Sequence, residues 1–498
     1  MDLALFFSSV FFSFTFIFSL FSLSICISRL NLWCTCEICD TFVSGRWRRR
    51  FDNLSDWYTD LLRRSATTTV HVHVINNTVT ANPMNVEHIL KTNFDNYPKG
   101  KPFSAILGDL LGRGIFNVDG DSWRFQKKLA SLELGSASTR SFAFDVVTFE
   151  IRQRLLPLLT SVSGRSDSVL DLQDILRRFT FDTICKFSFG LDPGCLRLPL
   201  PVSEFATAFD AASRLSAGRA LVAVPLVWKI KRLLNIGSEK KLRESIQLVN
   251  RLAEELISER REKGFSDKHD LLSRFMGAIN DDKYLRDIVI SFILAGRDTV
   301  ASALTSFFWL LTQNPTAESS IRLELDQVMG PGPDPVTATY DQTREMHYLH
   351  AALHESMRLY PPVQFDSKFS LDDDVLTDGT FVKKGTKVTY HPYAMGRMDM
   401  IWGPDCDEFR PERWLKDGKF SSENPFKYPV FQAGLRVCLG KEMSLVEMKC
   451  VAIALIRRFR IRVADPGWIP IFEAGLTATV RGGLPVLIEE REVTQHHH

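Results

Sequence analysis

The sequence predicts a mainly α-helical protein with a smaller β region. Helical patterns fill most of the stretch from Trp123 to Arg358, and Ser444 to Phe459 is another strongly helical run. Alternating β-prone residues occur at Val70–Val74, at Lys387–Tyr390 and again within Leu476–Ile488. Because these strands are short and lie outside the helical stretch, we expect a helical core with small sheets beside it.

The composition is that of a globular protein without a strong overall charge. The chain has 498 residues, of which 45% are hydrophobic and 24% are charged, and its formal net charge is +2. This balance gives no electrostatic reason to expect a nucleic-acid partner. No internal repeat and no Pro- or Gly-rich linker divides the chain after residue 52, so residues 53–495 are predicted to form one domain.

Residues 1–30 are predicted to be a single-pass transmembrane anchor. Leu3 to Ile27 carries no charged side chain and is long enough to span a bilayer. Only Asp2 precedes it, whereas arginines follow in the predicted basic, cysteine-rich connector at 31–52. The positive-inside rule places the domain in the cytosol, which fits the endoplasmic reticulum membrane. A cleaved signal peptide is the alternative, but it would need a basic start and a shorter apolar run.

The nine cysteines do not form the pattern of a disulfide framework, because their number is odd and their spacing irregular. Three of them, Cys34, Cys36 and Cys39, cluster in the connector. They are predicted to be free thiols, with metal binding and palmitoylation as alternatives. The terminal His496–His498 is either a natural end or the remnant of a tag.

The strongest motif is the run FQAGLRVCLG, which contains Phe431, Gly434, Arg436, Cys438 and Gly440. The following helix favours a thiolate at its N-terminus, and the two glycines let backbone N–H groups approach the sulfur. The phenylalanine can screen the sulfur from water, and the arginine can pair with a haem propionate. This pattern is typical of a cysteine thiolate that binds haem iron, and it disfavours the alternative of a buried structural cysteine.

Two further segments accompany this motif. Glu355 and Arg358 lie three residues apart on a predicted helix, and Arg413 follows in the segment PERW. Together with the cysteine motif they resemble the cytochrome P450 superfamily, in which these three residues form a buried ionic network under the haem loop. The resemblance implies the cytochrome P450 fold, with the haem between an oxygen-groove helix and the cysteine loop.

The long apolar helix predicted from Leu285 to Thr312 contains the run AGRDT, which ends at Thr299. The resemblance implies that Gly296 opens a groove for dioxygen, and that Asp298 and Thr299 relay protons during oxygen activation. A hydroxyl within a helix often bonds back to the carbonyl four residues earlier, which is the structural alternative for Thr299.

Other residues resemble the haem contacts of the superfamily. Trp123 and Lys127 match a W-x3-R element that holds a haem propionate, with lysine in place of arginine. Lys368 stands where relatives often carry another propionate-binding arginine. A solvated lysine is the alternative at both positions. Ala295 occupies the place where animal fatty-acid omega-hydroxylases have a glutamate that esterifies the haem, so we expect haem b to be held non-covalently.

Longer stretches narrow the resemblance to plant enzymes. Four stretches resemble the plant fatty-acid omega-hydroxylase clan: LSDWYTDLLRRS at 54–65, ANPMNVEHILKTNFDNYPKG at 81–100, DLLGRGIF at 109–116 and YPPVQFDSKF at 360–369. Within this clan the chain is most similar to the jasmonoyl-isoleucine oxidases. The stretch ASLELGS at 130–136 resembles the subgroup that oxidises omega-hydroxy-jasmonoyl-isoleucine to the omega-carboxylate.

The resemblance implies an NADPH-dependent monooxygenase that uses O2 and receives electrons from a separate NADPH–cytochrome reductase in the same membrane. Its expected substrate is a small lipophilic carboxylic acid, held end-on so that the terminal carbon reacts. Oxidation of jasmonoyl-isoleucine, and especially of its omega-hydroxy form, to the carboxylate would inactivate the hormone. Four phenylalanines are predicted to line a narrow channel, with core packing as the alternative: Phe103, Phe116, Phe292 and Phe365.

Three alternative functions are open at this point. Fatty-acid omega-hydroxylation, which yields cutin or suberin monomers or dicarboxylic acids, is the nearest. A fatty-acid hydroperoxide isomerase needs neither O2 nor a reductase and typically lacks the helix threonine, so Thr299 and Asp298 disfavour it. A non-catalytic haem sensor would have no use for the proton relay and oxygen groove that the resemblance implies.

Overall fold

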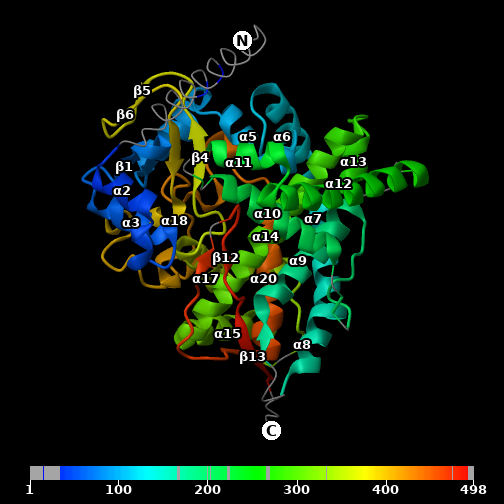
Figure 1. Ribbon diagram of the computed structural model, residues 1–498. Helices are drawn as coiled ribbons and strands as arrows, with labels where there is room; N and C mark the ends of the chain where they lie inside the picture. The colour runs from blue at the N-terminus through cyan, green and yellow to red at the C-terminus, as the bar shows by residue number, and fades with distance from the viewer. Residues whose placement is uncertain are drawn as a thin grey trace, which may run out of the picture.

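The computed structural model describes residues 34–491, apart from 165–168, 199, 202, 221, 223–224, 265–269, 333 and 474, together with Thr15 and Ser19. Figure 1 shows helices gathered on one side of the molecule and the larger sheet on the other. Except for Thr15 and Ser19, the predicted anchor at 1–30 lies outside the described residues, as does His496–His498.

Most of the described residues are helical, which confirms the predicted fold class. The longer helices are α2 (Glu37–Ser44), α3 (Leu54–Arg64), α5 (Gly100–Leu111), α6 (Gly120–Leu134), α7 (Ala137–Glu150), α9 (Leu172–Phe189), α10 (Glu204–Ala220), α11 (Pro225–Leu234), α12 (Gly237–Lys263), α14 (Asp282–Gln313), α15 (Pro315–Met329), α17 (His347–Leu359) and α20 (Lys441–Arg458). The shorter helical segments are η1 (Arg46–Arg49), η2 (His73–Ile75), α4 (Pro83–Glu87), η3 (His88–Thr92), η4 (Phe94–Asn96), η5 (Ile151–Leu155), α8 (Leu156–Val162), α13 (Leu271–Met276), α16 (Tyr340–Glu345), α18 (Pro392–Met395), α19 (Asp399–Trp402), η6 (Pro411–Trp414), η7 (Pro429–Phe431) and η8 (Gly434–Arg436).

The long helix α14 forms the centre of the helical side. It begins after Asp281, whose side chain accepts a hydrogen bond of 3.1 Å from the Tyr284 N–H and so caps the first turn. The helix packs against α9, α12, α17 and α20, and most of its side chains are buried. Among the described residues, α14 is the helix that is long and apolar enough to cross a membrane, but its burial identifies it as a core helix.

The β region consists of small sheets. The largest has the order β1 (Thr69–Val72), β2 (Asn77–Thr80), β7 (Lys387–Tyr390) and β4 (Asp366–Phe369). The pair β2–β7 is parallel, whereas β1–β2 and β4–β7 are antiparallel. The other strands are β3 (Leu170–Asp171), β10 (Phe459–Val463) and β13 (Pro485–Glu490) in one sheet, and the pairs β5 (Asp374–Val375) with β6 (Phe381–Val382), β8 (Leu415–Lys416) with β9 (Lys419–Phe420), and β11 (Phe472–Glu473) with β12 (Thr479–Val480).

Three large apolar clusters hold these elements together. One surrounds the C-terminal half of α14 at Phe307 and joins it to α9, α17 and α20. A second surrounds the N-terminal half at Ile293 and joins it to α10, α12 and α13. The third lies against the four-stranded sheet around Val388 and includes Cys39 of α2 and Trp57 of α3. The segment predicted as a connector therefore packs onto the domain, at least through α2.

A buried ionic network links α17 to the chain that leads toward the cysteine loop. The Glu355 carboxylate lies 2.8 Å from the Arg358 guanidinium and 3.3 Å from Arg413, so the structure brings together the three residues singled out in the sequence. The same carboxylate accepts hydrogen bonds from the Trp414 indole and the Arg410 N–H, both at 2.9 Å. Glu355 and Arg358 are fully buried. Each charge therefore depends on its partners for compensation.

We predict that Glu355→Gln strongly destabilises the fold, because it leaves the buried Arg358 charge without its carboxylate. Removal of one partner from a buried ion pair costs about 3–5 kcal/mol. The midpoint of thermal unfolding, followed by circular dichroism on the full chain in detergent, should fall accordingly. The matched control is Glu87→Gln, which breaks the exposed pair with Lys91. Equal midpoints for the two variants would contradict a structural role for the network.

Candidate active site

The cysteine loop is shaped by glycine and by a close contact with an early part of the chain. Gly434 has φ +59°, and a Cβ at this position would lie 3.0 Å from the carbonyl carbon of Leu90 and closer still to its oxygen. Only glycine fits both this backbone conformation and this contact. The Cys438 N–H donates to the Phe431 carbonyl oxygen at 2.8 Å, which closes the loop just before α20.

Cys438 lies three residues before Lys441, the first residue of α20, as the motif predicts. Cys438 forms no disulfide. Burial by the surrounding protein raises the pKa of the Cys438 thiol, whereas the Gly440 N–H and the Lys441 ammonium act in the opposite direction. A free thiol among N–H donors, with cations nearby, is the donor set that suits a haem: the thiolate for the iron and the cations for the propionates.

Three of the predicted haem contacts converge beside this loop. The Arg436 guanidinium lies 4.4 Å from the centre of the Trp123 ring, and the Lys127 ammonium lies 5.3 Å from it. Lys127 donates to the Leu435 carbonyl oxygen, and Arg436 donates to Asp119 at 2.6 Å. Burial lowers the pKa of both Lys127 and Arg436. Lys127 is half-buried, and its contact with a propionate stays a prediction.

Lys368 is buried and belongs to a charge cluster that the sequence did not reveal. Its ammonium donates to Asp366 at 2.9 Å, and Lys99 donates to the other oxygen of the same carboxylate. Tyr390 donates to Asp366 at 2.8 Å. Burial opposes ionisation of Asp366, but the Lys368 and Lys99 charges outweigh it and hold the pKa of this carboxyl well below its usual range.

The same cluster lies within electrostatic reach of the cysteine loop. Burial lowers the pKa of Lys368 to about 7, and the neighbouring Lys99 and Arg436 charges add to this effect while Asp366 opposes it. Lys99 also lies 4.2 Å from the centre of the Phe103 ring. Lys99 and Asp366 lie within stretches that resemble the plant clan, but no motif in the sequence singled out either residue.

On α14 the three predicted catalytic residues have different surroundings. The Thr299 hydroxyl is half-buried and donates to the Ala295 carbonyl oxygen at 2.6 Å, which is the structural alternative named above. Asp298 is buried, and its carboxylate lies 3.2 Å from Arg297 and 3.7 Å from Arg177. Burial raises the pKa of Asp298, while these two arginines oppose the rise.

Gly296 has a packing role that the sequence did not predict. A Cβ here would collide with the Ile184 side chain of α9, so the glycine lets α9 and α14 approach closely. The open side of Gly296 thus faces a neighbouring helix. The oxygen groove assigned to this residue stays a prediction.

The four phenylalanines do not share one environment. Phe103 and Phe292 pack against the same apolar cluster, whereas Phe365 contacts His391 with ring centres 5.8 Å apart and Phe116 is exposed. A small pocket is lined by Ile115, Gln126, Leu129, Ala130, Phe275, Ile288, Ser291 and Phe292. Phe292 therefore lines a pocket, and the channel formed by all four stays a prediction.

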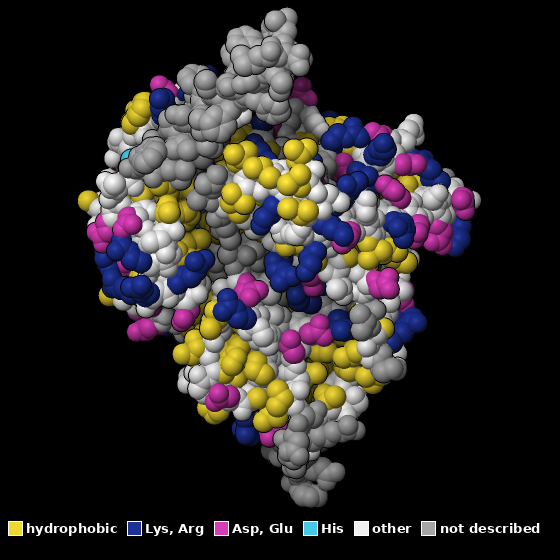
Figure 2. All heavy atoms as spheres, viewed as in Figure 1, with side chains coloured by type: hydrophobic (Ala, Val, Ile, Leu, Met, Phe, Trp, Pro, Cys, Tyr) yellow, Lys and Arg dark blue, Asp and Glu magenta, His cyan; other side chains and the backbone are white. Residues whose placement is uncertain are grey.

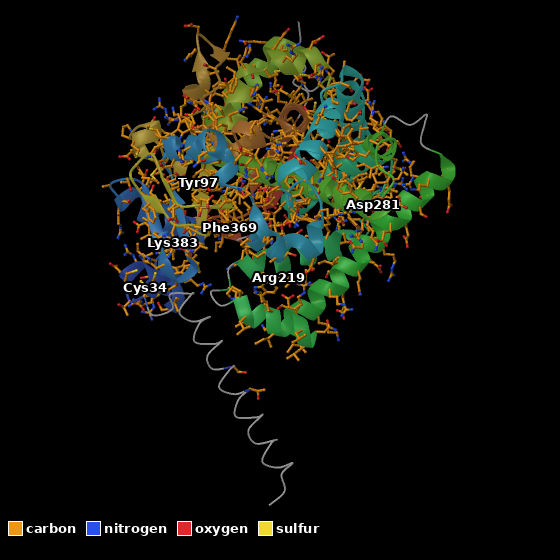
Figure 3. The ribbon with its side chains drawn as sticks, turned by 90° about the horizontal axis from the view of Figure 1, so that it is seen from above. Cys34, Tyr97, Arg219, Asp281, Phe369 and Lys383 are labelled. Atoms are coloured by element: carbon orange, nitrogen blue, oxygen red, sulfur yellow. The ribbon has the colours of Figure 1, made fainter. Side chains whose placement is uncertain are left out.

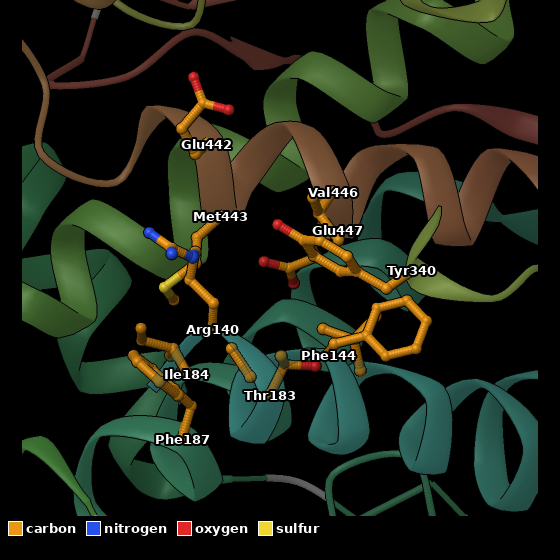
Figure 4. Close-up of a pocket in the computed structure, with 12 residues that line it drawn as sticks. Arg140, Phe144, Thr183, Ile184, Phe187, Tyr340, Glu442, Met443, Val446 and Glu447 are labelled. Atoms are coloured by element: carbon orange, nitrogen blue, oxygen red, sulfur yellow. The ribbon is translucent and has the colours of Figure 1, made fainter. Parts of the chain in front are cut away.

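A second pocket lies between α7, α9 and α20 (Figure 4). It holds none of the predicted site residues. Glu447 lines it, and one oxygen of this carboxyl group is buried without a hydrogen-bond partner. Burial raises the pKa of Glu447 to about 8, so the group is largely protonated at neutral pH.

Comparisons with known proteins show the family of the chain. Residues 42–482 match the family described as Cytochrome P450. Cytochrome P450 94C1 of Arabidopsis thaliana is 66% identical over 97% of this chain and 99% of its own length. Cytochrome P450 94B1 of Arabidopsis thaliana is 49% identical over 88% of each chain, and Cytochrome P450 94A1 of Vicia sativa is 44% identical over 90% of this chain and 88% of its own.

A solved structure shows the same fold. The crystal structure of the cytochrome P450DA haem domain superposes with a TM-score of 0.74 at 21% sequence identity, over 90% of this chain and 94% of that one. The matched region contains the cysteine loop, the α17 network and α14. On these grounds the chain belongs to the cytochrome P450 family, as a relative of the plant enzymes numbered 94.

Proposed function

We propose that this cytochrome P450 oxidises the terminal carbon of jasmonoyl-isoleucine, and especially of its omega-hydroxy form, to the carboxylate. The enzyme is a haem-thiolate monooxygenase that uses O2 and electrons supplied from NADPH through a reductase. The observation that carries the substrate proposal is the place of Ala130, the first residue of the stretch that resembles the hormone-oxidising subgroup. It lines the same pocket as Phe292 of α14.

The lining of this pocket combines apolar side chains with one polar side chain that has a free acceptor. Most of its wall is apolar, but Gln126 also lines it, and the Oε1 of Gln126 is buried without a partner. Its Nε2 is already engaged, since it donates to the Arg113 carbonyl oxygen at 2.9 Å. A free buried acceptor favours a ligand that brings an N–H or O–H group. Jasmonoyl-isoleucine has an amide N–H, and its oxidised form adds a hydroxyl.

Residues of the chain would bind the haem and supply protons. Bound haem supplies the activation of dioxygen. Cys438 would hold the iron, and Lys127 and Arg436, which lie beside Trp123, would pair with the propionates. On α14, Thr299 carries a hydroxyl proton, and the Arg177 and Arg297 contacts hold the Asp298 carboxyl in place behind it. Repeated oxidation of one carbon converts the alcohol to the aldehyde and then to the acid.

The surface of α11 supports attachment of the domain to a membrane. Its exposed apolar residues recur along one face at Leu226, Val227, Ile230, Leu233 and Leu234. Figure 2 shows hydrophobic side chains gathered over the place that α11 occupies in Figure 1. Basic residues also lie on this helix. A helix of this kind lies in the membrane interface, consistent with a cytosolic domain seated on the endoplasmic reticulum.

A substrate comparison tests the proposal directly. Microsomes that contain the chain and a plant reductase would receive NADPH with jasmonoyl-isoleucine, its omega-hydroxy form or lauric acid, and mass spectrometry would identify the products. We expect the omega-hydroxy conjugate to gain a carboxylate at the highest kcat/KM. Faster oxidation of lauric acid would instead make the enzyme a fatty-acid omega-hydroxylase. Turnover without NADPH would support an isomerase.

The role of Gln126 is open to a separate test. Loss of a buried hydrogen bond costs about 1–3 kcal/mol, so Gln126→Leu should lower kcat/KM for the conjugates about 10- to 100-fold. Oxidation of lauric acid, which has no internal polar group, should change little. Leu129→Met alters the same pocket without touching a polar group and is the matched control. An equal loss on both substrates would assign Gln126 a packing role only.

For Thr299, we predict that the alanine variant lowers product formation about 10²-fold while haem content stays normal, as for loss of a positioned proton donor. Thr305→Ala is the control, because Thr305 lies on the same helix and its hydroxyl donates to the Ala301 carbonyl oxygen at 2.7 Å. Product formation and NADPH consumption would be measured together in both variants. If both variants lose activity equally, the two hydroxyls stabilise helix α14 and Thr299 has no separate role in proton transfer.

A further inference from the structure

The three cysteines of the connector come together at the start of α2. Cys34, Cys36 and Cys39 each direct a sulfur to a common point, and the three sulfur atoms lie within 4.8 Å of one another. Among the residues that the structure describes, no other group of histidine, cysteine or acidic side chains meets this condition. Cys34 lies at the outer edge of the molecule (Figure 3). The three cysteines belong to none of the predicted haem contacts described above.

Local structure explains how the chain forms this cluster. Cys36 precedes α2 in an extended conformation, with φ −64° and ψ 151°, and Cys39 follows within the first turn of the helix. The two sulfurs are thus held one helical turn apart, the C-x2-C spacing common in metal sites. Cys39 is fully buried in the cluster beside the four-stranded sheet, so one corner of the site is fixed to the domain.

Backbone N–H groups surround the sulfurs as they do in metal thiolate sites. Those of Ile38 and Cys39 lie beside the Cys36 sulfur, and that of Val74 in η2 lies beside the Cys39 sulfur. Such donors stabilise negative charge on sulfur and orient a thiolate ligand. The arginine-rich segment η1 follows α2 directly and contacts it, which supplies positive charge nearby.

We propose that Cys34, Cys36 and Cys39 bind one Zn²⁺ ion as three thiolates, with solvent as the fourth ligand. Zinc–sulfur bonds of about 2.3 Å in a tetrahedral site place the sulfurs about 3.8 Å apart, within the observed limit. Binding to three thiols releases three protons and leaves one net negative charge beside η1. Because Cys39 is fixed to the domain, the ion would also fix the part of the connector before α2 to the domain.

The other fates of these thiols fit the structure less well. A disulfide would join two of the sulfurs and leave the third without a partner. Disulfides are also rare in the cytosol, where the domain is expected to lie. Acylation of Cys39 would require a buried sulfur to leave the apolar cluster. Metal binding uses all three sulfurs in the places where they already lie.

Zinc content tests the proposal independently of enzyme activity. The full chain would be purified in detergent through an affinity tag without histidine, because the terminal histidines can bind metal. Elemental analysis by mass spectrometry should find about one zinc per chain, and the double variant C34S/C36S should retain about ten-fold less. The matched control is C450A, which removes a buried cysteine in α20 distant from the cluster. It should keep its zinc.

Alkylation supplies a second measurement that does not depend on retained zinc. Iodoacetamide should label Cys34 and Cys36 slowly in the untreated chain and rapidly after a strong zinc chelator, and added Zn²⁺ should restore the protection. The proposal is overturned if the chain holds no more zinc than C34S/C36S, if the chelator leaves labelling unchanged, or if peptide mass spectrometry finds a disulfide or an acyl thioester on these cysteines.

Discussion

The buried guanidinium of Arg358 holds together the backbone segments that lead to the cysteine loop. All five of its N–H donors are used: two bond to Glu355, and the others to the carbonyl oxygens of Gly396, Cys406 and Glu408. A fully buried cation tolerates no missing partner, so these contacts fix several separate backbone segments at once. A Cβ at Gly396 would collide with the Arg358 carbonyl oxygen, so even the smallest side chain is excluded there.

A second electrostatic arrangement follows from strand register. Because β4 runs antiparallel to β7, Asp366 pairs with Tyr390 across the sheet, and Lys99 reaches the same carboxylate from before α5. Two lysines share one acid here, next to the Arg436–Asp119 pair, so three basic groups face two carboxylates beside the cysteine loop. In this way the β region sets the electrostatic surroundings of a loop that packs mainly against helices.

The sequence predicts those features whose residues lie close together along the chain. The cysteine loop, the central helix and the Glu355–Arg358 pair depend on local spacing, and the structure places them as expected. Lys99 and Asp366 are separated by 267 positions and meet only because the sheet forms, so no local pattern could reveal them. The same holds for Gly296, whose packing partner Ile184 belongs to another helix.

The contact between Gly434 and Leu90 has a consequence for the order of folding. Leu90 belongs to η3, near the start of the domain, and the cysteine loop rests directly on its backbone. During synthesis the early segment leaves the ribosome long before the loop does. The segment under the loop is therefore made first, and the Cys438 thiol can reach its final surroundings only after most of the chain has been made.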